Sequence, residues 1–395
     1  MESYSLLFIL PDISNKRILA LKSGDQFYFP FYDKPVDINV GFDEPQMFND
    51  IFREAMGIHV FRRYTFNTQN YVVFVFEQAE KTDSTHQNGY DWVSYEDFIA
   101  ATHNDEVRSI AQNVSKNYNI SENMPWVNAD GFLPYFKWLR DSCAEKQIYI
   151  CGKITQIKNA YVSTVFCIET NIGNLYMKIP GKIYLSELPL THELKRIMDL
   201  PIWLAYDFDM NVVLMEDMGG DDLPPQADIN TLHKVISKIA KIQKDTLQLL
   251  PSDSTYYDYS VSNLLKKLKD FHIKSFDILK GTPYELTQGE FEQLAANIAT
   301  AAALLESVAG VPVPNTINHG DIRPGNIRVT SGGYIIYDWS QGAVTHPFVD
   351  YDWVEAIHLA WDGAVDTMSA DGWLLERRNY YFANVLRRFL GKTLV

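Results

Sequence analysis

The sequence predicts an α+β fold that is divided into more than one domain. The chain has 395 residues, which exceeds what one hydrophobic core usually organises. Strand-like segments dominate residues 1–100 and 145–216, and helical patterns dominate from residue 231 onward. Separate runs of strands and of helices are typical of α+β proteins.

The first hundred residues predict a small α+β unit. SLLFIL, RILAL and YVVFVFE are apolar segments that predict three strands. Residues 45–56 predict a helix, which Gly57 is placed to end as a C-cap. Residues 100–130 are polar and contain several Asn residues, which indicates a connector and a domain boundary.

The next segment changes to strands that favour a sheet. TVFCIET and NLYMKI, joined by a turn at residues 171–173, predict an antiparallel hairpin. NVVLME at residues 211–216 predicts a third strand after a short helical stretch. Gly219-Gly220 and Pro224-Pro225 then interrupt the chain.

The remaining residues predict helices with one hairpin between them. Apolar residues at helical spacing predict a helix at 231–250. Thr287 and Glu290 form a capping-box pattern at the start of a helix that covers 288–309. Two further helical patterns lie near 351–361 and 371–390.

Composition narrows the classes of partner. The formal net charge is −15 and no long basic run occurs, so the electrostatic footprint of a nucleic-acid-binding protein is missing. The three cysteines show no metal-binding or disulfide spacing, which favours a reducing cytoplasm. We expect no membrane association, because no signal peptide and no 18-residue apolar stretch is found.

The segment HGDIRPGNIRVTSGGYIIYD, residues 319–338, places a His, two Asp and an Asn at fixed offsets. Its two strands predict a hairpin that brings Asn326 close to Asp338. Phosphoryl transfer needs a carboxylate to orient the attacking hydroxyl, oxygen ligands for Mg²⁺ and a Lys against the phosphates. The segment supplies the first two.

The alternative reading is that Asp321 and Asn326 are turn residues around Pro324-Gly325. Singly, each is more often a turn residue than a catalytic one. The combined spacing has a chance frequency on the order of 10⁻⁴ at average residue usage, and it therefore favours the catalytic interpretation.

On these residues, about 145–395 resembles the aminoglycoside phosphotransferase and choline kinase-like family. The resemblance implies a two-lobed protein kinase-like fold, with Asp321 as the catalytic base and His319 bracing the loop. It also implies that Asn326 and Asp338 hold Mg²⁺. The later segment PFVDYDW looks like a further family segment, in which Asp350 would anchor the catalytic loop.

The same resemblance implies a nucleotide lobe upstream. Lys178 would pair with the α- and β-phosphates, and Glu187 is preferred over Glu193 as its carboxylate partner. The backbone near Glu216 and Met218, in LMEDMGG, would bond the adenine edge.

Two residues depart from the patterns of related kinases. The turn near residues 158–163 has no glycines, and Ser163 would supply a hydroxyl and backbone N–H groups to the phosphates. Arg323 stands where many family members have His, which would change acceptor or phosphate contacts.

Residues 1–100 resemble a Nudix domain in their element order, ending in WVSYEDF. Nudix hydrolysis needs adjacent metal-binding glutamates. The helix keeps Glu54, but Ala55 replaces the second glutamate, and Asp50-Ile51 replaces the Arg-Glu pair of the box. The resemblance therefore implies a degenerate Nudix-like α/β domain without hydrolase activity, which would serve in ligand sensing or docking.

The expected domains are a degenerate Nudix-like domain at 1–100, a helical and loop connector at 101–144, a nucleotide-binding lobe at 145–220 and a catalytic lobe at 221–395. The expected function is ATP- or GTP-dependent transfer of the γ-phosphate to a hydroxyl of a small molecule, with Mg²⁺. The sequence holds no signal for the oligomeric state.

The acceptor is open, although the acidic chain would attract a cationic one. Asp362, Asp366 and Glu376 are candidates to meet such an acceptor, against the ordinary reading of solvated helix carboxylates. The alternative function is a non-catalytic nucleotide-sensing pseudokinase, and Nudix-type hydrolysis is weaker. Protein kinase activity is disfavoured because HGD and Asp-Trp replace HRD and DFG.

Overall fold

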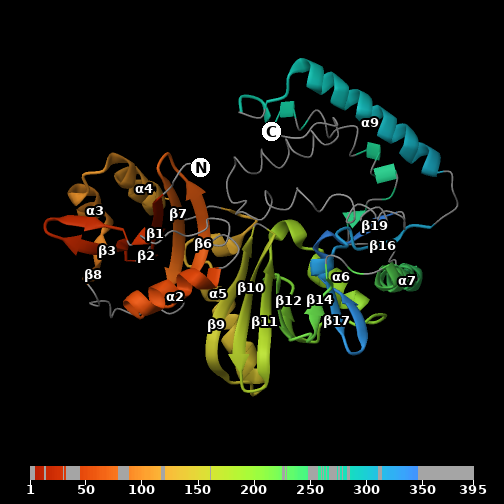
Figure 1. Ribbon diagram of the computed structural model, residues 1–395, viewed down its shortest axis with the longest axis horizontal. Helices are drawn as coiled ribbons and strands as arrows, with labels where there is room; N and C mark the ends of the chain where they lie inside the picture. Colours follow the sequence, from red (N-terminus) through yellow and green to blue (C-terminus); the bar gives the residue numbers. More distant parts are fainter. Residues whose placement is uncertain are drawn as a thin grey trace. The chain divides into compact units, whose positions relative to one another are not determined.

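The computed structural model is a mixed α+β protein, as predicted, and it contains two compact units (Figure 1). Among the described residues, unit 1 comprises those up to Ile183 and Trp203–Asp217, and unit 2 comprises Tyr184–Ile202 and those from Met218 onward. The structure describes residues 5–345 apart from these positions: 13–14, 30, 33–44, 79–88, 117–120, 161, 225–226, 228, 248–256, 259, 261, 264, 267–273, 275, 278, 283–284 and 310–313. The expected boundaries near 100 and 144 both fall within unit 1.

Unit 1 begins with a four-stranded sheet in the order β5-β1-β7-β6. Its strands are β1 (Ser5–Ile9), β5 (Phe31–Tyr32), β6 (Val60–Asn67) and β7 (Tyr71–Gln78), with β1 parallel to β7. Helix α2 (Pro45–Met56) ends at Gly57, whose φ of +68° and N–H bond to Arg53 O confirm the predicted C-cap. The helix buries Phe48 and Phe52 against Phe8 and Phe76 of the sheet, which explains its one-sided apolar pattern.

A smaller sheet, three α-helices and one 3₁₀ helix follow within the first 145 residues. The sheet has the order β2-β3-β4, and β8 also pairs with β3. Its strands and the following elements are β2 (Pro11–Asp12), β3 (Arg17–Ser23), β4 (Gln26–Tyr28), β8 (Tyr90–Ser94), α3 (Tyr95–Ala101), α4 (Asp105–Lys116), η1 (Pro125–Val127) and α5 (Leu133–Glu145). The expected polar connector is thus largely helical.

The second large sheet of unit 1 has five antiparallel strands in the order β12-β13-β11-β10-β9. They are β9 (Ile150–Ala160), β10 (Ser163–Thr170), β11 (Gly173–Pro180), β12 (Trp203–Asp207) and β13 (Val212–Glu216). The predicted hairpin is confirmed by the β10–β11 register, in which Thr170 faces Gly173. The edge strands β9 and β12 were not predicted, because their exposure does not alternate regularly.

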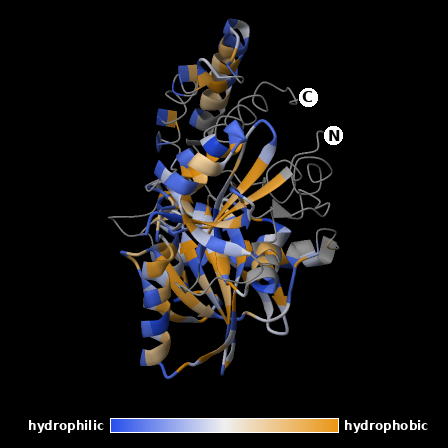
Figure 2. Cartoon of the chain, turned by 90° about the vertical axis from the view of Figure 1, so that its left-hand side faces the viewer, coloured by the Kyte–Doolittle hydropathy of each residue, from blue (hydrophilic) through white to orange (hydrophobic). Residues whose placement is uncertain are grey.

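One hydrophobic cluster runs through both large sheets of unit 1. It extends from Leu7 in β1 to Leu214 in β13. Four Phe rings join the two parts: Phe166 of β10 lies 5.0 Å from Phe61 of β6, and 5.5 and 5.1 Å from Phe132 and Phe136. Figure 2 shows hydrophobic residues along the strands, whereas the helices carry both kinds of residue. The N-terminal hundred residues therefore share a core with the five-stranded sheet.

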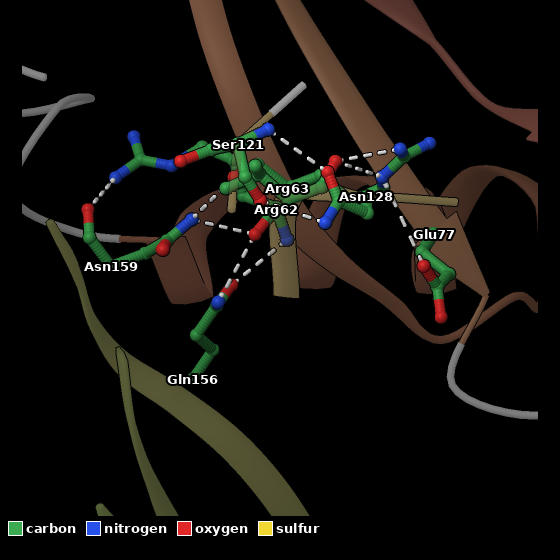
Figure 3. A network of polar contacts seen from close by, with 8 residues as sticks. Arg62, Arg63, Glu77, Ser121, Asn128, Gln156 and Asn159 are labelled. Carbon is green, nitrogen blue, oxygen red and sulfur yellow. Dashed lines mark hydrogen bonds and ion pairs between the residues drawn. The ribbon is translucent and has the colours of Figure 1, made fainter. Parts of the chain in front are cut away.

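A buried polar network also joins the two sheets (Figure 3). The side-chain amide of Gln156 bonds the backbone of Arg62 in the way that a neighbouring strand would. It accepts from Arg62 N at 2.8 Å and donates to Arg62 O at 3.1 Å. Asn159 donates to Arg62 O at 2.6 Å, and Arg62 Nη2 donates back to Asn159 O at 3.2 Å. Both residues lie in the second half of β9, so this network holds the part of the strand that leads into the β9–β10 turn.

Arg63 forms the other half of this network. Its Nε and Nη2 atoms donate to Val127 O at 3.1 and 2.6 Å, and Nε lies 3.9 Å from Glu77 Oε2. Both side chains are nearly buried, at 2% and 10% exposure. Buried charges are retained when they are paired and hydrogen-bonded. The Arg63 guanidinium has both a hydrogen-bond acceptor in Val127 O, 64 positions away in sequence, and a neighbouring carboxylate in Glu77.

Within its described residues, unit 2 combines helices with two three-stranded sheets in the orders β14-β17-β18 and β15-β19-β16. The α-helices given there are α6 (Glu187–Leu194), α7 (Ile229–Thr246) and α9 (Gln288–Ala309). Its strands are β14 (Asp221–Asp222), β15 (Tyr257–Asp258), β16 (Thr316–Asn318), β17 (Ile327–Thr330), β18 (Gly333–Ile336) and β19 (Ala343–Thr345).

Local predictions in unit 2 are confirmed where the structure describes the residues. Glu290 N donates to Thr287 Oγ1 at 3.3 Å and Thr287 N to Glu290 Oε2 at 3.0 Å, which is the reciprocal capping box. The helices expected at 351–361 and 371–390 lie outside the described residues. Within the part of the chain that the structure describes, no helix is both long and apolar enough to cross a membrane.

Candidate active site

The loop from His319 to Asn326 follows the buried strand β16. Asn318 ends the strand, and its side chain donates to Thr345 O and accepts from Gln243 of helix α7. Gly320 adopts a φ of +77°, and a Cβ atom there would lie 2.6 Å from Gln341 O. Only glycine accepts both this conformation and this close approach, so the His-Gly-Asp order has a local structural cause.

His319 connects this loop to the end of the hairpin. It is fully buried, its ring lies 4.7 Å from the ring of Trp339, and Nδ1 accepts from Asp321 N at 3.2 Å. An imidazole nitrogen that accepts carries no hydrogen, so the neutral ring is protonated on Nε2. Nε2 therefore donates to Tyr337 O at 2.8 Å. The ring spans from the residue before Asp338 to the backbone of Asp321.

Asp321 is the carboxylate at the centre of the loop. Asn326 Nδ2 donates to its backbone O at 2.8 Å and to Oδ2 at 3.0 Å. Arg323 Nε lies 3.3 Å from the same Oδ2. Both contacts use Oδ2, and they leave Oδ1 for the hydroxyl of an acceptor.

Burial raises the pKa of the Asp321 carboxyl above its usual value. The positive charge of Arg323 and the hydrogen bond from Asn326 oppose this effect, and the negative charge of Asp338 adds to it. A carboxylate with a raised pKa is a better base than an exposed aspartate. Asp321 thus combines the geometry and the chemistry that a hydroxyl-orienting base needs.

The hairpin β17–β18 carries the chain from Asn326 to Asp338, as predicted, with Ile327 opposite Ile336. Asn326 lies in the 3₁₀ turn η3 (Pro324–Asn326) and is 2% exposed. Asp338 precedes the 3₁₀ turn η4 (Trp339–Gln341) with φ +63° and ψ +61°. Asp is one of the few residues that enter this left-handed region, which aims its side chain differently from a strand residue.

The donor atoms of this pair fit a Mg²⁺ ion. The amide nitrogen of Asn326 is committed to Asp321, so its Oδ1 atom is the one oriented as a metal ligand. Mg²⁺ prefers oxygen ligands and typically takes one or two protein groups besides phosphates and water. Among the described residues no group of three or more His, Cys, Asp and Glu could hold a metal.

The candidate nucleotide residues of unit 1 lie on the five-stranded sheet. Lys178 sits in the central strand β11, opposite Val165 and Val213, and is 8% exposed. Ser163 begins β10 and is 1% exposed, and its Oγ atom has no hydrogen-bond partner among the described residues. A buried hydroxyl in this position, at the turn after β9, has a free capacity to bond an added ligand.

The other candidates divide between the units. Glu187, in unit 2, is 4% exposed at the start of α6, where Leu190 and Leu194 share a hydrophobic cluster with Ile336 and Trp339. The side chain of Glu193 is 40% exposed and lies 3.0 Å from Arg196. Glu216 ends β13 in unit 1 and Met218 begins the second stretch of unit 2.

Four candidate residues lie near the chain end. Asp350, Asp362, Asp366 and Glu376 lie outside the described residues. The candidate acceptor residues among them therefore stay predictions.

Three residues beside the site were missed by sequence reasoning. Tyr337 OH donates to Gly325 O at 2.6 Å, and it lies 3.2 Å from Asp222 Oδ1. Arg328 Nη1 donates to the same Asp222 Oδ1 at 2.8 Å. The segment YIIYD reads as an ordinary strand, and the Asp222–Arg328 pair joins residues 106 positions apart. The one signal in the sequence that could have indicated a role for Tyr337 is its position directly before Asp338.

One family model matches part of the chain. Residues 201–384, slightly less than half of the chain, match the Phosphotransferase enzyme family. This stretch contains the whole His319–Asp338 segment. No curated protein matches the chain in sequence.

Solved structures show distant likenesses. A choline/ethanolamine kinase family protein from Mesorhizobium loti is 16% identical, with 62% of this chain and 72% of that chain covered and a TM-score of 0.39. A choline kinase from Streptococcus pneumoniae is 10% identical, with 66% and 94% covered and a TM-score of 0.40. APH(2″)-IIa, in a ternary complex with streptomycin and ATP, is 11% identical, with 66% and 96% covered and a TM-score of 0.43.

Proposed function

We propose that the chain is a small-molecule kinase of the phosphotransferase family, which transfers the γ-phosphate of ATP or GTP to a hydroxyl of its acceptor. The observation that carries this proposal is the hydrogen-bonded set of His319, Asp321 and Asn326, joined by a hairpin to Asp338. The family match over residues 201–384 supports it.

In this proposal Asp321 accepts the hydrogen bond of the acceptor hydroxyl through Oδ1 and orients its oxygen for in-line attack on the γ-phosphorus. Asn326 and His319 hold the Asp321 carboxylate and backbone in place. A Mg²⁺ ion, held by Asn326 Oδ1 and Asp338, would neutralise phosphate charge. Arg323 lies beside Asp321, where it would contact the acceptor or the transferred phosphate.

The nucleotide is assigned to the strands that precede this loop. Lys178 would pair with the α- and β-phosphates, Ser163 would bond a phosphate oxygen, and the backbone at Glu216 and Met218 would bond the adenine edge. Supporting observations are the burial of Lys178 in the central strand and the unpaired Oγ of Ser163 among the described residues. We propose that residues 145–220 form this nucleotide lobe and residues 221–395 the catalytic lobe.

We propose Glu187, and not Glu193, as the carboxylate partner of Lys178, because only Glu187 is buried. Glu187→Gln is expected to slow phosphate transfer by about 10- to 100-fold, the size of a lost charge-assisted bond. Glu193→Gln serves as the matched control and should stay within about twofold of the parent. ADP release at saturating acceptor measures both, and equal losses in the two variants would contradict the assignment.

We propose that residues 1–100 are a degenerate Nudix-like α/β domain without hydrolase activity, followed by a connector at 101–144. Helix α2 ends at Gly57 as such a domain requires, and Glu54 is exposed on it next to Ala55. Pyrophosphatase activity that disappears in Glu54→Gln would favour the hydrolase alternative. The cysteines are free, and we propose the cytoplasm as the compartment.

A nucleotide titration tests the proposed function directly. ATP or GTP with Mg²⁺ should raise the melting temperature by several degrees, because a ligand at 100 times its Kd adds about 2.7 kcal/mol. No shift with either nucleotide would overturn the proposal. ADP release should then be screened across amino alcohols, aminoglycosides and sugars, with cationic acceptors favoured by the net charge of −15.

A nucleotide-sensing pseudokinase is the second candidate. It predicts the thermal shift without turnover on any acceptor. The two readouts together therefore separate the enzyme from the sensor.

A further inference from the structure

We infer, on the basis of the proposed function, that Tyr337 is a positioning residue that sets the two expected Mg²⁺ ligands, Asn326 and Asp338. Tyr337 lies between strand β18 and Asp338 in the chain. Its backbone N–H donates to Asn326 O at 3.0 Å, and its backbone O accepts from His319 Nε2 at 2.8 Å. The main chain of Tyr337 is thus hydrogen-bonded to Asn326 and to His319 of the catalytic loop, and it continues directly into Asp338.

The phenol adds a contact that an apolar residue would not make. Tyr337 OH donates to Gly325 O at 2.6 Å, and Gly325 is the central residue of the turn η3 that ends at Asn326. The backbone N–H therefore bonds Asn326 itself, while the hydroxyl bonds the preceding residue. Two bonds from one residue restrict the rotation of the Asn326 peptide and with it the direction of Oδ1.

An ion pair lies beside the hydroxyl. Asp222 Oδ1 lies 3.2 Å from Tyr337 OH and accepts from Arg328 Nη1 at 2.8 Å. The Arg328 guanidinium lies 6.0 Å from the centroid of the Tyr337 ring. A phenol has one hydrogen to donate, and the shorter distance makes Gly325 O its main acceptor and Asp222 Oδ1 its second one.

Tyr337→Phe in the full chain removes the hydroxyl and leaves the ring and both backbone bonds. Binding of a fluorescent ATP analogue, mant-ATP, should be titrated with Mg²⁺. We expect the Mg²⁺ concentration for half-maximal binding to rise about five- to tenfold, the effect of one hydrogen bond. Binding without Mg²⁺ and the melting temperature should stay close to those of the parent, because no core contact is lost.

Tyr334→Phe is the matched control, since Tyr334 lies on the same hairpin opposite Val329. It should titrate like the parent. Unchanged Mg²⁺ dependence in Tyr337→Phe would overturn the positioning role alone. An equal loss of affinity with and without Mg²⁺ would also overturn it, because that result indicates general destabilisation. A parent chain that does not bind mant-ATP with Mg²⁺ would overturn the proposed function as well.

Discussion

Asp321→Asn is expected to lower the rate of phosphate transfer by about 10²- to 10⁴-fold, the usual contribution of a general base. The amide matches the carboxylate in size but has no negative charge and cannot take a proton from the acceptor hydroxyl. It would also place an NH₂ group or a weaker acceptor against Asn326 Nδ2 and Arg323 Nε. The rate of ADP release with the acceptor identified by screening measures the effect.

Nucleotide binding should persist in Asp321→Asn, because no nucleotide contact is assigned to this residue. Asp277→Asn, an exposed residue of unit 2, is the control for an Asp-to-Asn change and should keep full activity. Full turnover in Asp321→Asn would exclude Asp321 as the base. A parent chain that binds nucleotide but turns over no acceptor would favour the pseudokinase alternative. Loss of both turnover and the thermal shift by nucleotide would indicate a structural role.

Arg63→Met is expected to lower the free energy of unfolding of unit 1 by about 3–5 kcal/mol, as is typical when one partner of a buried pair is removed. Methionine has a similar length, but it loses both bonds to Val127 O and leaves Glu77 without this guanidinium. Urea unfolding followed by tryptophan fluorescence measures the change, because Trp126 is buried in the same network.

Arg140→Met, at an exposed position of α5, is the matched control and should change stability by less than about 0.5 kcal/mol. The double variant Arg63→Met with Glu77→Gln should recover part of the loss, since the buried carboxylate that faces Arg63 loses its charge too. A loss in Arg63→Met no larger than in the control would show that the buried contacts of Arg63 contribute little.

The elements that depend on local signals could be predicted from the sequence. The capping box at Thr287, the C-cap at Gly57 and the two hairpins follow from residues within a few positions of each other. The edge strands β9 and β12 could not, because their residues are mostly exposed or half-buried without alternation. Their strand conformation comes from pairing with β10 and β13.

In the candidate site, too, the features that depend on local sequence could be predicted, and those that depend on tertiary contacts could not. The spacing within residues 319–338 placed His319, Asp321 and Asn326 on one loop, and the structure joins them by hydrogen bonds. The tautomer of His319 and the support from Asp222 depend on tertiary contacts that no spacing encodes. Arg62 and Arg63 are 1% exposed, although arginine is usually a surface residue. Their burial could not be predicted, because the groups that they bond lie 64 to 97 positions away in sequence.

The shared core of unit 1 has a consequence for the order of folding during synthesis. Phe61 and Arg62 leave the ribosome about a hundred residues before Phe166 and Gln156, with which they pack and bond. Strand β13, in the same cluster, ends only at Glu216. Contacts of such long sequence separation form slowly. The apolar face that the nascent N-terminal strands contribute to this core therefore stays partly exposed until more than half of the chain has emerged from the ribosome.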